Sequence, residues 1–379
     1  MTAGAYPAAR TVVPRIESHF ARHLEAARQH GVAPLASSPD PEAIEAIIDA
    51  AFWASLRREE GYVPKISFAF LPPEQSERPL RFEQPLALTP DALARVAPAV
   101  ERPGIHLGVW RGPDGLCVWG TTRSIPAYCF VLEVAAPGLL VVKHHRSGEA
   151  GKFANIAVLE GDDIKVVDEQ ASSLPDCPAL LRSMLGFDSP ASWIDSVNVL
   201  VQLAVSMRGH GRGGLLLVVP SHTEAWRESI VRPIPYALLQ PFSELRELGR
   251  QPPDERRYRS WQEALGRAVE SIAGLTAVDG ATVLTDQHDL LAFGAKIARR
   301  EGWPQVEKVI VTEPIEGRPA AVFDPGQLGG TRHLSAAQFV HDQRDAVALV
   351  ASQDGRFTVF AWSPCDQMVH AHRVEALLL

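Results

Sequence analysis

The chain has little cysteine and no cysteine pairing pattern. Four cysteines occur among its 379 residues, and none forms a C-x-x-C motif. This pattern argues against a zinc site or a disulfide framework and is typical of a reducing compartment.

Long apolar runs are also absent. No stretch approaches ~18 uninterrupted apolar residues, so the sequence predicts no transmembrane helix. Residues 1–15 lack the charged-then-apolar pattern of a signal peptide. These absences predict a cytoplasmic protein that does not engage a membrane.

Positive charge is in deficit, with a formal net charge of −8. Binding to duplex nucleic acid is not expected, because such affinity depends on many phosphate contacts. A small phosphorylated ligand needs only a few local cations and stays compatible with this charge. The composition is otherwise that of a globular protein, and the length allows two domains.

The N-terminal part reads as helices followed by strands. Residues 13–30 have helical apolar spacing, and Ser-Pro-Asp-Pro at 38–41 predicts the cap of a second helix ending near Gly61. Residues 65–168 then read as mainly antiparallel strands, including a hairpin around Gly-Pro-Asp-Gly at 112–115. We expect a domain over residues 1–175.

A second domain is expected over residues 190–379. A helix over 192–207 leads through an Arg- and Gly-rich run at 208–214 into an apolar strand at 215–219. A phosphate-binding loop follows a strand and opens a helix, whereas this run does the reverse, so a simple turn is favoured. Arg208 and Arg212 are left as residues that could flank a ligand. The predicted fold class is α/β (α+β), with a mixed sheet flanked by helices in this domain.

Three short motifs in this domain carry candidate chemistry. Asp279-Gly280-Ala281 enters an apolar strand, and Gly330-Thr331-Arg332-His333 opens a helix. Ser-Gln-Asp-Gly at 352–355 joins two strands. An acid that can hold a cation and a Gly-flanked arginine that can hold phosphate are the two halves of a nucleotide site.

In their order and context these motifs resemble those of the diadenylate cyclase (DAC) domain, which joins two ATP molecules into cyclic di-AMP. That family carries D-G-A, then G-T-R-H-R-A-A, then S-E-E. The resemblance implies a DAC-like mixed sheet and a bound nucleotide or cyclic nucleotide, with Mg²⁺ or Mn²⁺. The ligand-binding residues that it implies are Asp279, Gly280, Ala281, Gly330, Thr331, Arg332, His333 and Ser352. Asp279 would hold the metal and, in an active enzyme, be the catalytic residue, while Asp354 could partly replace a missing carboxylate.

The departures from the family pattern concern its charged positions. Leu334 stands where the family has a second arginine, which implies the loss of one phosphate-facing cation, and Gln353 replaces the first acid of S-E-E. Val278 replaces the preceding histidine. Arg332 follows Asp279 by 53 positions, which implies an inserted element around residues 302–319. Such erosion is what we expect of the DAC-related probable sensor group, DACNV.

Three functions therefore stay open. The first is a sensor of a nucleotide or nucleotide-derived second messenger, working with a second copy or an effector protein and without turnover. The second is an active cyclase, which would need ATP, a divalent metal and a face-to-face dimer. The third is a structural module with a vestigial pocket.

Plainer interpretations exist for single residues as well. Asp279 could merely cap a turn, and residues 352–355 could be a simple hairpin turn. His19 and His23 are four positions apart, but Phe20 occupies the place of the metalloprotease glutamate. The pairs His144-His145 and His370/His372 lack partners at metal spacing and are interpreted as surface histidines.

Overall fold

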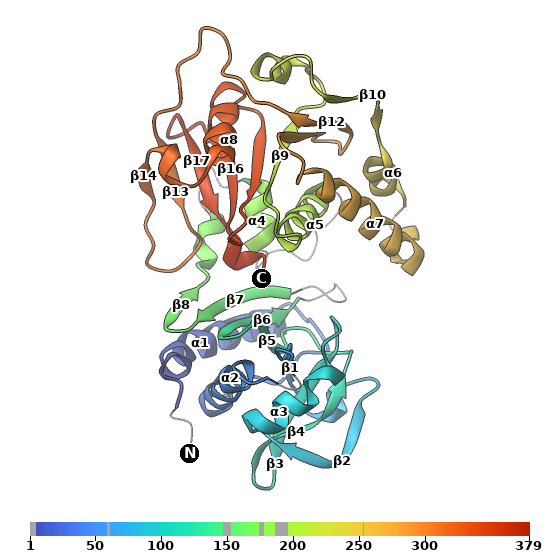
Figure 1. The fold of residues 1–379 in the computed structure, drawn as a ribbon. Helices are drawn as coiled ribbons and strands as arrows, with labels where there is room; N and C mark the ends of the chain where they lie inside the picture. Colours follow the sequence, from blue (N-terminus) through green and yellow to red (C-terminus); the bar gives the residue numbers. More distant parts are fainter. Residues whose placement is uncertain (1–4, 59–60, 147–152, 174–177, 186–195, 253) are drawn as a thin grey trace. The chain divides into compact units, whose positions relative to one another are not determined.

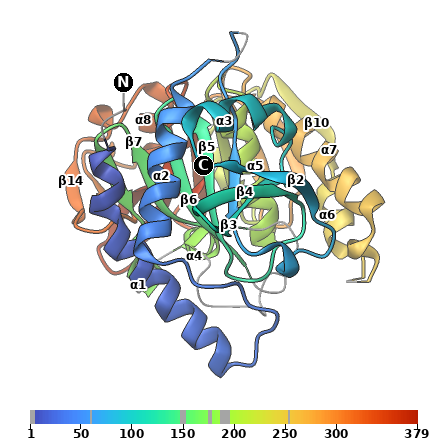
Figure 2. The ribbon, with the colours of Figure 1, turned by 90° about the horizontal axis from the view of Figure 1, so that it is seen from below.

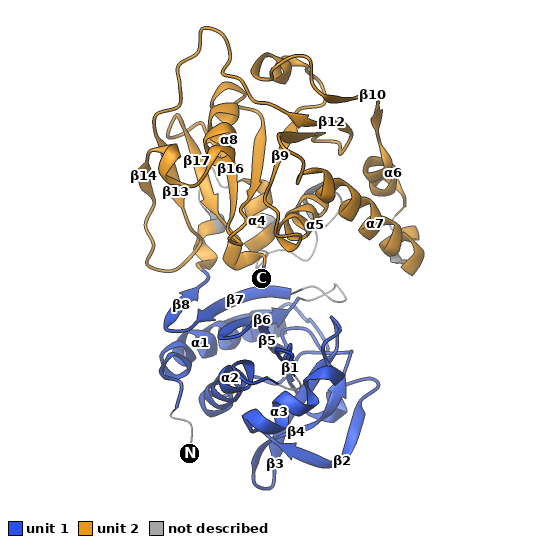
Figure 3. Cartoon of the chain, viewed as in Figure 1, with its two compact units in different colours: residues 1–167, 379 blue, residues 168–378 orange. Residues whose placement is uncertain are grey.

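The computed structural model describes residues 5–58, 61–146, 153–173, 178–185, 196–252 and 254–379. The chain divides into two compact units, residues 1–167 with 379 and residues 168–378 (Figure 3). The division falls at 167/168, whereas the sequence placed the end of the first domain at 175. Helices and two mixed sheets are present, which confirms the α/β class.

The helices of both units are short to medium in length (Figure 1). None of those in the described ranges is long and apolar enough to cross a bilayer. Their bounds are α1 (Pro7–Gln29), α2 (Pro41–Ser55), α3 (Pro90–Val96), α4 (Ala179–Leu185), α5 (Ser196–Gly209), α6 (Glu244–Arg250), α7 (Arg259–Leu275) and α8 (Thr331–Asp342).

The first unit contains a sheet with the strand order β2-β4-β3-β1-β5-β6-β7-β8. Only β1 and β3 pair in parallel among its described neighbours. The bounds are β1 (Ser67–Phe70), β2 (Leu80–Ala87), β3 (His106–Gly112), β4 (Gly115–Thr122), β5 (Phe130–Ala136), β6 (Leu139–His145), β7 (Phe153–Glu160) and β8 (Asp163–Val166).

Helices α1 and α2 lie side by side against one face of this sheet (Figures 1 and 2). Their apolar stripes, with Ile16, Phe20, Ile44 and Ile47 fully buried, form the main core of the unit with the inward residues of the strands. The cap of α2 is confirmed, because the Asp40 carboxylate accepts a hydrogen bond from the Ala43 amide at 2.8 Å.

Two sequence-based expectations about this unit were wrong. The first helix begins at Pro7, not at residue 13, so Pro14 lies inside it. The imidazole of His144 is buried, with its Nδ1 2.8 Å from Nε2 of His19, so His144 is not a surface residue. Strand β6 has nearly every residue covered, and its alternation places His144 toward α1.

The second unit contains a sheet with the order β10-β12-β11-β9-β15-β16-β17-β13-β14. Parallel pairs are β9 with β11 and β13 with β17. The bounds are β9 (Gly214–Val219), β10 (Tyr236–Phe242), β11 (Ala281–Thr285), β12 (Leu290–Ala295), β13 (Val309–Thr312), β14 (Ala321–Phe323), β15 (Val347–Ala351), β16 (Phe357–Ser363) and β17 (Met368–Arg373).

Helices cover both faces of this sheet. Helix α8 packs on β9, β15, β16 and β17, and α5 contacts β15 and α7 (Figure 1). Strand β9 is buried along its whole length, as expected for a central strand between two helical layers. The expected start of α5 at residue 192 lies outside the described residues. The region expected to be inserted, 302–319, contains β13, which pairs with β17.

The Gly-rich run at 208–214 is a turn between α5 and β9, as predicted. Arg208 contacts the backbone of two other segments of the second unit. Its guanidinium donates to the carbonyl oxygens of Gly355, at 3.1 Å, and Leu378, at 3.4 Å. Arg208 therefore fastens the end of α5 to the β15–β16 turn. His372 is also buried, which contradicts its interpretation as a surface histidine.

Candidate functional site

Three neighbouring strands bring separate parts of the chain to one edge of the second sheet. Strands β9 and β11 run parallel, and β15 runs antiparallel to β9 with Ala351 opposite Gly214. The starts of β9 and β11 therefore lie at the same edge as the end of β15. This order places Asp279, Gly213 and Ser352 at that edge, although they are far apart in sequence.

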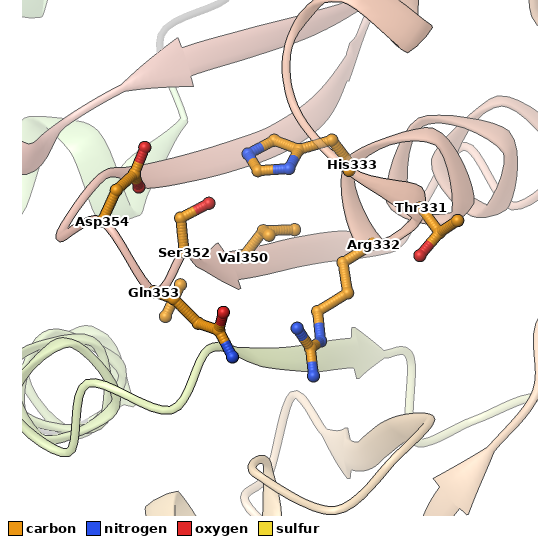
Figure 4. Close-up of a pocket in the computed structure, with 9 residues that line it drawn as sticks. Thr331, Arg332, His333, Val350, Ser352, Gln353 and Asp354 are labelled. Atoms are coloured by element: carbon orange, nitrogen blue, oxygen red, sulfur yellow. The ribbon is translucent and has the colours of Figure 1, made fainter.

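Helix α8 supplies the other wall of the site. Gly330 is its N-cap and has no side chain to satisfy the first amides of the helix. Because α8 packs on β15 and β16, its first turn faces the β15–β16 turn. Between them lies a pocket of about 330 Å³, here called the Arg332 pocket, lined by residues 330–333 and 350–354 (Figure 4).

The Arg332 side chain points toward the start of β9 (Figure 4). Gly213 has φ +72°, and a Cβ there would lie 2.9 Å from an Arg332 guanidinium nitrogen. Gln353 donates a hydrogen bond to the Arg212 carbonyl at 3.4 Å, which ties the β15–β16 turn to the same segment. Over the described parts of the chain, Arg332 forms no ion pair with a carboxylate.

His333 is a buried and neutral member of the pocket. Its side chain is 3% exposed, and Gly329 leaves room for it, since a Cβ at 329 would be 2.5 Å from Nδ1. Burial lowers the pKa of His333, and the charges of Arg373 and Arg356 lower it further, against the opposing effect of Asp354. The imidazole is therefore uncharged at neutral pH and can act as donor and acceptor.

Asp279 lies at the margin of the site and is not among the residues that line the Arg332 pocket. Its side chain is 91% exposed, and its Oδ2 is 2.5 Å from the ammonium of Lys296. The hydrogen bond and charge of Lys296 lower the pKa of Asp279, and Arg332 lowers it further.

Gly280 and Ala281 serve the hairpin, not the pocket. Gly280 has φ +114°, and a Cβ there would lie 2.4 Å from the Gly294 carbonyl carbon. Ala281 is fully buried in β11. Of the residues expected at the site, the structure gathers Gly330, Thr331, Arg332, His333, Ser352 and Asp354 around one pocket.

Leu334, where the family pattern has a second arginine, is not among the residues that line the Arg332 pocket. Leu334 lines a different pocket of about 400 Å³, together with Ile297 and Arg299. Residues 332 and 334 point to different sides of α8 because consecutive helical positions turn by ~100°.

The residues present do not form a resident site for Mg²⁺ or Mn²⁺. Asp279 is paired with Lys296, and the Asp354 carboxylate accepts from the Arg356 amide at 3.3 Å and lies 3.4 Å from its guanidinium. Within the described ranges, no group of three carboxylates or imidazoles gathers at this edge.

Lys296 and Gly213 were missed in the sequence. The β11–β12 hairpin is the feature of the sequence that could have identified Lys296. Strands β11 and β12 pair with Ala281 opposite Ala295, so the residue after β12 must lie beside the residues before β11. Gly213 had no local signal, because its contact with Arg332 depends on the packing of α8.

Comparisons with solved structures and curated proteins identify no relative from which a function could be inferred. A structure described as a hypothetical membrane spanning protein from Bacillus cereus shares 14% sequence identity, over 48% of this chain and 65% of that one, with a TM-score of 0.28. The chain thus covers less than two thirds of that protein, and so low a TM-score supports no statement about fold or function. No curated protein matches the chain.

A family model does match. The probable sensor domain DACNV matches residues 33–123, which lie within the first unit. The motifs on which the sequence-based resemblance rested lie in the second half of the chain, which this match does not cover. No residue of the Arg332 pocket is in the matched segment. Residues 33–123 are thus similar to a probable sensor domain.

Proposed function

We propose that this protein is a sensor whose second unit binds a nucleotide or nucleotide-derived signal in the Arg332 pocket. The match of residues 33–123 to a probable sensor domain supports the general role. The chemistry of the pocket supports the class of ligand, because its cation, hydroxyls and helix terminus are all suited to phosphate.

The observation that carries the proposal is the placement of Arg332. Its guanidinium has no carboxylate partner among the described residues and stands beside the N-terminus of α8. The first amides of a helix lack intrahelical partners, and a guanidinium can bind two phosphate oxygens at once. Thr331 and Ser352 add hydroxyl groups on two sides of the same pocket.

The other residues orient the ligand. Neutral His333 offers a hydrogen bond from the buried wall without adding charge. Asp279, ionised and exposed beside Lys296, can accept a hydrogen bond from a ribose hydroxyl. A metal-dependent cyclase is the weaker candidate, since its chemistry needs several metal-binding oxygens, and here both nearby carboxylates already have cationic partners.

Thermal unfolding with a ligand panel tests the proposal. The panel holds ATP, GTP, dATP, cyclic di-AMP, other cyclic nucleotides and ADP-ribose-type compounds, each with and without Mn²⁺. A ligand present at 100 times its dissociation constant stabilises the folded state by about 2.7 kcal/mol. We expect a shift for at least one compound, lost in Arg332→Ala and kept in Arg259→Ala, an exposed arginine of α7 paired with Glu263.

Two outcomes would contradict the proposal. If Arg332→Ala leaves every ligand shift unchanged, the pocket is not the binding site. If ATP with Mn²⁺ is consumed to give a cyclic dinucleotide, and Asp279→Asn abolishes the product, the protein is an enzyme and not a sensor without turnover.

A further inference from the structure

Lys296 lies next to the candidate site although it is not part of any motif in the sequence. It directly follows β12, whose Ala295 pairs with Ala281 of β11. Lys296 therefore stands beside the residues that precede β11, and its ammonium is 2.5 Å from Asp279 Oδ2. The hairpin fixes this position, so the lysine is held at the edge where Arg332 also lies.

Asp279 is hydrogen-bonded to one cation and lies one strand away from another. Lys296 donates to its carboxylate, and Arg332 lies against Gly213, which precedes β9 as Asp279 precedes the parallel neighbour β11. One carboxylate cannot neutralise both, so this edge carries an excess positive charge, to which the uncharged His333 adds nothing. An edge with two cations around one acid is suited to an anion of more than one charge.

The ion pair between Lys296 and Asp279 is readily exchanged. The side chains are 50% and 91% exposed, respectively. Exposed pairs of this kind contribute little to stability because water screens both partners. A lysine ammonium on a flexible four-carbon stem can therefore turn from the carboxylate to a phosphate at small cost.

We propose that Lys296 is a second phosphate-binding residue of the site, so that the preferred signal carries two linked phosphate groups. The inference rests on the proposed function of the Arg332 pocket. Arg332 and the N-terminus of α8 take one phosphate, and Lys296 takes the next. Leu334 of α8 is uncharged and lines a different pocket. Lys296 therefore supplies a second cation that α8 does not provide.

Matched nucleotide pairs test this inference independently of the base. Binding of AMP and ADP, and of GMP and GDP, is measured by calorimetry on the full chain, at constant ionic strength and with EDTA. We expect Lys296→Gln to weaken binding of the diphosphate about tenfold and that of the monophosphate less than twofold. Lys308→Gln is the control, an exposed lysine just before β13, on the far side of the sheet.

The outcomes separate the two proposals. Arg332→Ala should weaken both members of a pair, whereas Lys296→Gln should act on the diphosphate alone. Suppose that wild-type protein binds both nucleotides of a pair. If Lys296→Gln then weakens binding of both equally, or of neither, the role of Lys296 is refuted, but the proposed function of the Arg332 pocket is not. If wild-type protein binds no member of either pair, no two-phosphate preference exists and this inference fails. The proposed function fails separately, if the wider ligand panel also gives no shift.

Discussion

The guanidinium of Arg332 lies against the backbone of Gly213, at a distance where a Cβ on residue 213 would be 2.9 Å from the arginine nitrogen. The lack of a side chain at Gly213, just before β9, thus leaves room for the side chain of Arg332, more than a hundred positions later in the chain. The positive φ of Gly213, +72°, gives it a second reason to be glycine.

Replacing Gly213 by alanine should separate these two effects. The backbone strain of alanine at positive φ costs about 1 kcal/mol. Gly211→Ala is the matched control, because Gly211 has φ +65° and nothing within 4 Å of a Cβ. We expect similar losses of unfolding free energy in both variants, measured by denaturant titration, but weaker nucleotide binding only in Gly213→Ala. Equal nucleotide binding by the two variants would show that the Arg332 side chain can move away from residue 213 without loss of affinity.

The close approach of Gly280 and Gly294 predicts a larger loss of stability. A Cβ on Gly280 would lie 2.4 Å from the Gly294 carbonyl carbon, and backbone at both ends of this contact cannot move aside easily. We expect Gly280→Ala to cost about 3 kcal/mol or more in the second unit. Gly302→Ala, with φ +77° and open space around the Cβ, is the control.

Tryptophan fluorescence reports this unfolding, because Trp226 is buried in the core of the second unit. Equal midpoints for Gly280→Ala and Gly302→Ala would mean that the β11–β12 hairpin tolerates a side chain at 280.

Two buried histidines predict a loss of stability on mild acidification. Burial lowers the pKa of His106 to about 4, and burial with the charge of His370 lowers that of His372 to about 3. The unfolded chain, with ordinary histidines, binds more protons between these values and about 6.5. Stability contributed by the neutral forms is therefore complete above pH 6.5 and is lost as pH falls toward the folded pKa values.

Between pH 7 and pH 5 each of these histidines should lower the free energy of unfolding by about 2 kcal/mol. In the second unit, His372→Gln should flatten this dependence while keeping a hydrogen-bonding group near Thr312, whose hydroxyl is 2.6 Å from His372 Nδ1. His222→Gln, at an exposed position, is the control variant. If the pH dependence of the unfolding free energy is unchanged in His372→Gln, His372 is not one of the groups that cause it.

Removal of the Asp279 charge distinguishes a metal-free site from a metal-dependent one. In the absence of divalent ions, Asp279→Asn should bind anionic ligands at least as tightly as wild type, because the variant frees Lys296 and removes a neighbouring negative charge. Mn²⁺ should make no difference between the two proteins. If Mn²⁺ tightens ATP binding in wild type and not in Asp279→Asn, the carboxylate holds a metal with the nucleotide.

Local features were the ones that could be predicted. The Asp40 cap, the turn between β3 and β4, and strand β9 follow from short patterns that need no distant partner. Strand β17 was missed because its residues, including His370 and His372, look polar in isolation, although half of them are buried and α8 packs against the strand. For the same reason the buried histidines His144 and His372 were interpreted as surface residues.

What the sequence determined by itself was which short segments exist and which chemical groups they carry: an acid before one strand, and an arginine at the start of a helix. The tertiary structure decided which of these groups meet. The strand order places Asp279, Gly213 and Ser352 at one edge, the packing of α8 brings Arg332 there, and the hairpin adds Lys296. It also turned Leu334 away from the Arg332 pocket. The reason is physical: propensity and capping act over a few residues, whereas a site is assembled by pairing and packing between segments far apart in the chain.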